Sequence, residues 1–426
     1  MNTFSLIFLL LLACALVFQL WLGRRHIAHV RACSHRVPRP FDQRITLDAH
    51  RKAAAYTVAR ARFEMAALIY HSLLLLVWTL GGGLAALDRA WRAMGWGEAA
   101  TGVAVILGVL FVSALLDLPL RLWRTYVIEQ DFGFNRTGPA LFATDLLREG
   151  LITLSLAGPL AALVLWLMND PAGGLRPLWW LYAWLAWNGF SLLMLWLYPA
   201  CIAPLFNRFT VLRDPALETR IRDLLRRAGF AARGIFVMDG SRRSAHGNAY
   251  FTGLGRHKRI VFYDTLLQAL AADEVEAVLA HELGHFRHHH VHKRLAAGAA
   301  LSLAGLLLLN FLMGQAWFFA GLGVTRPSAH LGLLLFTFTA PVFGYFLSPL
   351  PLWLSRLQEF QADAYAARHT SAAALARALL RLYEDNAATL TPDPLYSAFH
   401  DSHPPAPLRI ARLLQGKETR EPCAAS

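Results

Sequence analysis

Seven stretches of about 20 mostly apolar residues constrain this 426-residue chain more than any other feature of its sequence. A helix needs about 20 apolar residues to cross the hydrocarbon core of a bilayer. The hydrophobic content of 56% and the mean hydropathy of +0.39 agree with a membrane environment. The sequence therefore predicts a mainly helical, polytopic membrane protein. The predicted spans are residues 4–22, 65–87, 101–120, 151–168, 178–203, 295–321 and 331–354.

Basic residues predict how these spans are oriented. No Lys or Arg precedes the first span, whereas Arg24 and Arg25 follow it, which is typical of an uncleaved anchor with its N-terminus outside. The connection after the first span carries ten basic residues and the connection after the second carries two, so the positive-inside rule makes the former cytoplasmic. Alternation of the spans then puts the two longest polar segments, 204–294 and 355–426, on the same cytoplasmic side.

The segment between the fifth and sixth predicted spans has the patterns of a folded polar region. A helical pattern at 216–228 stops at Gly229, and short strand-like runs follow. A long helical pattern from Asp273 to Arg294 then leads directly into the sixth span. The predicted strands of a small sheet are 234–238, 248–252 and 259–263. The predicted organisation is a five-span membrane region at 1–203, a cytoplasmic catalytic segment at 204–294, two further spans at 295–354 and a C-terminal cytoplasmic segment at 355–426.

The net charge of +13 does not indicate nucleic-acid binding, because the arginines bracket apolar stretches and form no single stripe. The expected surroundings are a lipid bilayer, and the Arg and Ala bias favours a bacterial inner membrane. The four cysteines are scattered, so no disulfide framework or paired-cysteine zinc site is predicted. The C-terminal tetrapeptide that begins at Cys423 has the form of a prenylation signal, which we interpret as accidental in a multi-span bacterial protein.

The strongest chemical signal is the pentapeptide HELGH at residues 281–285. Positions four apart share a face of a helix, so the imidazoles of His281 and His285 can converge on one zinc ion. Glu282 then lies beside the water that the ion activates. The alternative is a polar helix surface with two solvated histidines, since this short pattern also occurs by chance.

A catalytic zinc takes three protein ligands and one water, so a third ligand is expected elsewhere. In the run SRLQEFQADAYA at 355–366, Glu359 and Asp363 are again four residues apart, in the other cytoplasmic segment. Glu359 is the predicted third ligand of a single zinc ion per chain. Asp363 is predicted to accept the free ring N–H of a ligand histidine. A solvated charge cluster that includes Arg356 is the alternative.

These motifs resemble the type I CAAX prenyl protease family of membrane zinc peptidases. The resemblance covers roughly residues 41–412 and keeps the family's motif order. Besides the two metal-site runs, it rests on DFGFN at 131–135, APLFN at 203–207, SAHGNAYF at 244–251, KRIVFYD at 258–264 and HDSHPP at 400–405.

The resemblance implies seven helices around a water-filled chamber, with a zincin-like α+β catalytic region at its cytoplasmic end. Its zinc ligands and catalytic Glu correspond to the residues inferred above from spacing, and Asp363 corresponds to an acid that can also donate a proton. It places Asn248 on an edge strand along which the substrate backbone lies. It also places His403 and Arg409 near the active site, where they can steady an oxyanion or contact the substrate. From the residues alone, His403 could simply end a helix and Arg409 could be a surface cation.

The predicted function is peptide hydrolysis by zinc-activated water, with Glu282 as the base and Glu282 or Asp363 returning the proton to the amine. The resemblance implies removal of a C-terminal tripeptide from prenylated C-a-a-X substrates, and trimming of membrane-associated peptides is a broader possibility. Three alternatives are a quality-control peptidase of the HtpX type, a transporter with structural zinc, and a silent scaffold. The further histidines at 288, 289, 290 and 292 are not expected to bind the metal.

Overall fold

The computed structural model describes residues 1–39, 41–170, 174–230, 234–252 and 259–418, and seven helices among them are long and apolar enough to cross a membrane. Large apolar side chains on these helices, such as Phe111, Trp166 and Leu301, are exposed. An apolar surface of this extent fits contact with lipid and not with water. The spans are Thr3–Cys33, Leu47–Trp78, Glu98–Asp131, Pro139–Met168, Trp179–Phe206, His290–Met313 and Ala329–Leu347.

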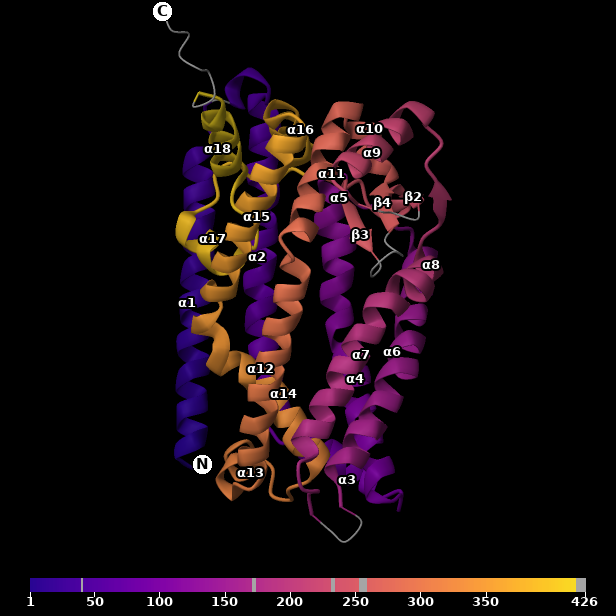
Figure 1. The fold of residues 1–426 in the computed structure, drawn as a ribbon. Helices are drawn as coiled ribbons and strands as arrows, with labels where there is room; N and C mark the ends of the chain where they lie inside the picture. The colour runs from indigo at the N-terminus through magenta and orange to yellow at the C-terminus, as the bar shows by residue number, and fades with distance from the viewer. Residues whose placement is uncertain (40, 171–173, 231–233, 253–258, 419–426) are drawn as a thin grey trace, which may run out of the picture.

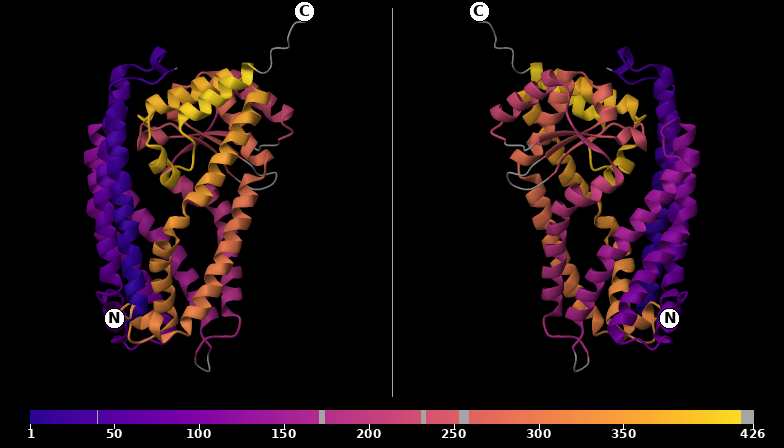
Figure 2. Two further views of the ribbon diagram at one scale, coloured as in Figure 1. Left: turned by 90° about the vertical axis from the view of Figure 1, so that its left-hand side faces the viewer. Right: turned by 90° about the vertical axis from the view of Figure 1, so that its right-hand side faces the viewer.

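The spans run lengthwise through the molecule, and the sheet lies at one of their ends (Figures 1 and 2). The N-terminus lies at the opposite end, where the Asn2 side chain donates a hydrogen bond of 2.8 Å to the carbonyl of Trp317. An odd number of spans thus brings the C-terminal helices to the sheet end. The helices within and next to the spans are α1 (Thr3–Cys33), α2 (Leu47–Trp78), α3 (Gly83–Arg92), α4 (Glu98–Trp123), α5 (Glu129–Asp131), α6 (Pro139–Met168), α7 (Trp179–Leu197), α8 (Ala203–Phe206), α12 (His290–Met313), α13 (Ala316–Gly321) and α14 (Ala329–Gly344).

The sheet has four strands in the order β1-β2-β4-β3. Strands β2 and β4 are parallel, whereas β1 and β3 each pair antiparallel with their neighbour, so β3 is an edge strand. The strands are β1 (Phe209–Val211), β2 (Gly234–Met238), β3 (Ala249–Thr252) and β4 (Arg259–Tyr263), and the helices of this region are α9 (Pro215–Arg227), α10 (Asp264–Ala269), α11 (Ala272–Arg287), α15 (Pro349–His369), α16 (Ala372–Asp385), α17 (Pro394–His400) and α18 (Ala406–Glu418).

One hydrophobic core joins the two polar segments of the chain. Ile221 of α9, Phe262 of β4 and Leu279 of α11 are buried together with Leu375 of α16 and Ile410 of α18. Burial of large apolar side chains is the main stabilising contribution to such a unit. The segments before the sixth span and after the seventh therefore form a single folded region. This confirms the predicted fold class of seven membrane helices with an α+β region that contains a small sheet.

Several predicted boundaries were wrong. The predicted second span, 65–87, ends at Trp78, because the chain turns at Gly82, which has a φ of +75°, and starts α3. The predicted sixth span, 295–321, ends at Met313 and is followed by a separate helix, α13. The predicted seventh span, 331–354, ends at Leu347, and α15 begins at Pro349. Strand β1 was not predicted.

The continuous helix predicted from Asp273 into the sixth span was also wrong. Helix α11 ends at Arg287, and α12 starts at His290. Between them His289 adopts a left-handed backbone conformation with a φ of +56°. This conformation is unusual for a residue with a Cβ. Neither Gly nor Pro, the usual signals of a helix end, marks the break in the sequence.

Candidate metal centre

Helices α11 and α15 carry the two halves of the site and pack closely against each other. Gly284 lies where they approach most tightly: a Cβ at this position would stand 2.8 Å from the Cα of Ala362. No side chain larger than hydrogen fits there. The small residues at these two positions therefore let α11 present His281 and His285 to Glu359 of α15.

Replacing Gly284 by Ala is expected to destabilise the protein by about 1–3 kcal/mol, because the added methyl overpacks a helix contact. The same change should weaken metal binding, since it separates the two helices that carry the site. Thermal unfolding in detergent and metal content measure the two effects. The control is Gly298→Ala in α12, where a Cβ would meet no atom within 4 Å. An equally stable Gly284→Ala protein with full metal content would contradict this packing argument.

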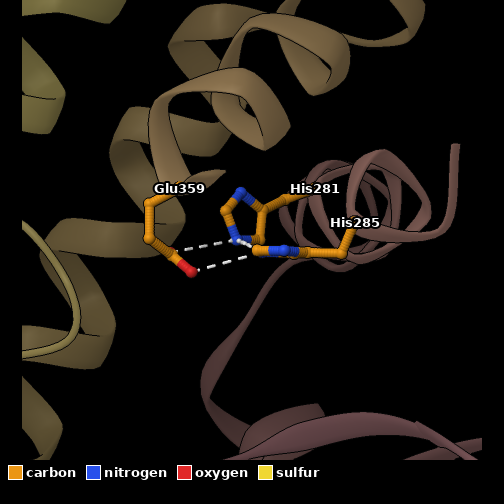
Figure 3. Close-up of side chains that lie close together, drawn as sticks. All are labelled: His281, His285 and Glu359. Carbon is orange, nitrogen blue, oxygen red and sulfur yellow. Dashed lines mark hydrogen bonds and ion pairs between the residues drawn. The ribbon is translucent and has the colours of Figure 1, made fainter. Parts of the chain in front are cut away.

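The side chains of His281, His285 and Glu359 converge between these helices (Figure 3). His281 Nε2 lies 3.3 Å from His285 Nε2 and 3.5 Å from Glu359 Oε2, and His285 Nε2 lies 3.3 Å from Glu359 Oε1. Atoms bound about 2.0–2.1 Å from a tetrahedral ion are about 3.3–3.4 Å apart. The triangle thus has the size that a tetrahedral ion requires. In the described part of the chain, no other three His, Cys, Asp or Glu side chains converge in this way.

The electrostatics of the triangle favour a cation. His281 Nδ1 lies 2.8 Å from Asp363 Oδ1, so its ring proton is held on the side away from Glu359. Burial would lower the pKa of His281, but hydrogen bonds with Asp363 and Glu359 outweigh burial and raise it to about 9. Burial would likewise raise the pKa of Glu359, but hydrogen bonds with histidines hold it well below its usual value. Buried acceptors that face one another are unfavourable without a positive charge between them.

A buried ion pair supports the triangle from the side of α18. Arg409 donates from Nε to Asp363 Oδ2 at 2.8 Å and from Nη2 to Asp363 Oδ1 at 2.6 Å. Its Nη1 lies 3.5 Å from Glu359 Oε2. Burial would raise the pKa of Asp363, but the bond to Arg409 outweighs burial and lowers it. Arg409 therefore lies inside the site, and it keeps Asp363 ionised next to His281.

Replacing Arg409 by Ala is expected to lower the free energy of unfolding by about 3–5 kcal/mol, because Asp363 would remain buried without its partner. The control is Arg412→Ala on the same helix, where the guanidinium is exposed and lies over the Phe360 ring at 4.4 Å. That change should lower the free energy of unfolding by less than about 1 kcal/mol. Unfolding curves in detergent compare the two variants, and equal losses would argue against the buried ion pair.

Glu282, which lies on α11 between the two histidines in sequence, and His403 are the remaining residues predicted for the site. The Glu282 carboxylate is half-buried, and it takes part in no hydrogen bond or ion pair with any residue that the structure describes. His403 comes from the segment before α18, and 64% of its side chain is exposed. Its Nδ1 lies 2.8 Å from Glu359 Oε2. Glu282 is thus a carboxylate without a hydrogen-bond partner in the described residues, and His403 is an imidazole that is largely exposed.

The predicted substrate strand lies beside the helix that carries HELGH. Strand β3 contacts α11, and its outer edge pairs with no strand in the described residues. Asn248, directly before β3, is exposed and accepts the Tyr263 N–H at 2.9 Å through its carbonyl oxygen. The edge strand expected around Asn248 is therefore present and is open along one side. Lys258 of the KRIVFYD motif lies outside the described residues, as does Cys423.

Gln361 and the role of His290 were missed by the sequence analysis. The metal group consists of His281, His285 and Glu359 and does not include the histidines at 288, 289, 290 and 292. His290 nevertheless contacts His285 and Gln361. No local signal points to Gln361, because this contact depends on the unpredicted turn before α12.

Matches to known proteins cover almost the whole chain. The model "CAAX prenyl protease N-terminal, five membrane helices" matches residues 26–208, and "Peptidase family M48" matches residues 211–417. A CAAX prenyl protease 1 homolog from Oryza sativa is 33% identical over 396 residues, which are 90% of this chain and 92% of the relative. This chain belongs to the CAAX prenyl protease 1 family. CAAX prenyl protease 1 of Saccharomyces cerevisiae is 34% identical over 71% of this chain and 69% of its own.

A crystal structure from the same family has the same fold. Ste24p of S. mikatae superposes with a TM-score of 0.89 at 29% identity and covers 97% of this chain and 99% of its own. A member of this M48 peptidase family is a metallopeptidase, and its five-helix membrane domain makes it an integral, multi-pass membrane protein. These matches favour the CAAX prenyl protease family over a shorter peptidase of the HtpX type, a transporter or a scaffold.

Proposed function

We propose that this CAAX prenyl protease relative binds one zinc ion through His281, His285 and Glu359 and cleaves C-a-a-X peptides, prenylated ones first among them. The observation that carries the proposal is the triangle of donor atoms with edges of 3.3–3.5 Å. Glu282 lies between its two histidines in the sequence of α11. Two imidazoles and one carboxylate are a donor set typical of catalytic zinc. Support for the substrate class comes from the names of the matched relatives.

The residues around the triangle are proposed to have different roles in the reaction. Bound zinc supplies a Lewis acid and lowers the pKa of water towards neutrality. Glu282 takes the proton of the attacking water and passes it to the departing amine, because its carboxylate has no other partner. Asp363 orients His281, since hydrogen bonds to Arg409 and His281 engage its oxygens. His403 donates a ring N–H to the carbonyl oxygen as negative charge develops there.

The substrate is proposed to bind as an additional strand. An extended peptide can pair with the open edge of β3, where main-chain hydrogen bonds hold it and Asn248 stands at the start of the strand. A cavity of about 810 Å³ lies next to His403 and is lined by polar side chains that include Arg60, Glu129 and Tyr396. A cavity of this size accommodates several residues of a peptide or an attached group. The cavity is proposed as part of the water-filled chamber.

The catalytic region is proposed to face the cytoplasm. The connections at its end of the spans are rich in Arg, whereas those at the other end carry only Arg89, Arg92, Arg176 and Arg326. The Arg- and Ala-rich composition supports a bacterial inner membrane, although the relatives named above are eukaryotic. We retain the proposed division at 1–203, 204–294, 295–354 and 355–426, in which the second and fourth segments form the catalytic region.

A cleavage assay tests the proposal. Purified protein in detergent is incubated with a farnesylated C-a-a-X peptide and with its unprenylated twin, before and after removal of metal by a chelator. Cleavage between the Cys and the following residue, lost on chelation and restored by zinc, is the expected result. Equal cleavage of the two peptides would assign the broader role in clearing membrane peptides. Metal-independent cleavage, or none by a protein that retains zinc, would overturn the proposed function.

A further inference from the structure

A second imidazole stands directly behind one of the metal-site histidines. His285 Nδ1 lies 3.0 Å from Nδ1 of His290. His290 Nε2 in turn lies 2.9 Å from Oε1 of Gln361 on α15. The His290 side chain is buried, with 1% of the residue exposed. These contacts form a chain of three side chains that runs from α15 through the first turn of α12 to α11.

The turn between α11 and α12 makes this chain possible. On a continuous helix, residues five apart point about 140° away from each other, so His290 could not face His285. His289 breaks the helix with its φ of +56°, and α12 begins with His290. A left-handed conformation is unfavourable for a residue with a Cβ and persists where the surrounding structure requires it. The turn therefore brings His290 back over His285.

The hydrogen bonds fix the position of each proton. The Gln361 Oε1 atom only accepts, so His290 carries its proton on Nε2. A neutral imidazole has one ring proton, and Nδ1 of His290 is therefore free to accept the Nδ1–H of His285. The Nε2 lone pair of His285 then points towards the triangle. The opposite arrangement, with a proton on Nδ1 of His290, would leave the proton of His285 on Nε2 and block the metal.

We propose that His290, held by Gln361, is a positioning residue that sets the tautomer and the ring orientation of the metal ligand His285. This inference rests on the proposed function, because it concerns zinc at the triangle. His281 has a carboxylate, Asp363, behind its ring. His285 has a neutral imidazole there, which orients the ligand without adding another buried negative charge next to Glu359.

Zinc affinity tests this inference directly. The zinc dissociation constant of the full-length protein in detergent is measured by competition with a chromophoric chelator. His290→Phe keeps the ring volume but removes the acceptor, and it should weaken zinc binding by about 10–100-fold. His290→Asn returns an acceptor oxygen near the position of Nδ1 and should restore the affinity to within a few-fold of the original. Gln361→Met should shift the affinity in the same direction as His290→Phe but by less.

His292→Phe is the matched control, because His292 is exposed and contacts none of the proposed ligands. The thermal midpoint of each metal-free protein and the visible spectrum of the cobalt-loaded protein are recorded in parallel. A merely structural His290 would lower the metal-free midpoint and leave zinc affinity unchanged, which would overturn the inference. Equal affinities for His290→Phe and His290→Asn would do the same. If the unmodified protein binds no zinc at this site, the proposed function itself fails.

Discussion

Replacing Glu282 by Gln is expected to lower the rate of peptide cleavage by about 10²–10⁴-fold, the usual contribution of a general base. Gln has almost the same shape as Glu but cannot take the proton of the attacking water. Because Glu282 forms no hydrogen bond or ion pair with the described residues, zinc content should stay at one ion per chain. Peptide turnover and elemental analysis of the same purified sample separate these two effects.

Glu276→Gln provides the matched control for this experiment. Glu276 lies on the same helix, but its carboxylate pairs with Arg220 and Arg227 at 2.9 and 2.8 Å. The same chemical change there should leave cleavage within a few-fold of the unmodified protein, since a surface ion pair contributes about 0–1 kcal/mol. A Glu282→Gln protein with undiminished peptidase activity would rule out Glu282 as the base.

Replacing Glu359 by Ala is expected to remove both zinc and activity. Changing a residue that only supports a ligand lowers metal affinity by about 10–100-fold. Loss of a ligand itself should lower the metal affinity by more than this. The change also removes the carboxylate that His281, His285 and Arg409 face. Zinc content after dialysis against a weak chelator is the measurement. It should fall from about one ion per chain to a small fraction of that.

The control for this variant is Glu384→Ala on α16, where the carboxylate is exposed and forms no ion pair with the described residues. That protein should keep its zinc and its activity. Full zinc occupancy in Glu359→Ala would show that the third ligand is a different residue. Zinc retained together with lost activity would point to a catalytic role for Glu359 instead of ligation.

Periodicity and spacing predicted the parts of this molecule that local sequence controls. Runs of about 20 apolar residues predicted the spans because the bilayer sets their length. His281 and His285 could be paired because residues four apart share a helical face. Strands β2 and β4 were predicted at their observed boundaries, since short β-branched and aromatic runs mark buried strands.

Other features depend on contacts between distant segments and were not predictable in this way. The break at His289 has no Gly or Pro, and it places His290 in contact with His285 and Gln361, which are set by distant packing. From the sequence alone, Arg409 could equally have been a cation on the surface. Its place in the site follows from how α18 packs on α15 and α16. The closeness of α11 and α15 at Gly284 is likewise a tertiary property.

The central claim is that α11 and α15 together hold one catalytic zinc ion. An anomalous difference map recorded at the zinc absorption edge, from crystals of the unmodified protein, tests it most directly. We predict one strong peak, about 2.0–2.1 Å from His281 Nε2, His285 Nε2 and a Glu359 oxygen. A peak at any other group of side chains, or zinc-replete active protein with no peak at this triangle, would contradict the claim.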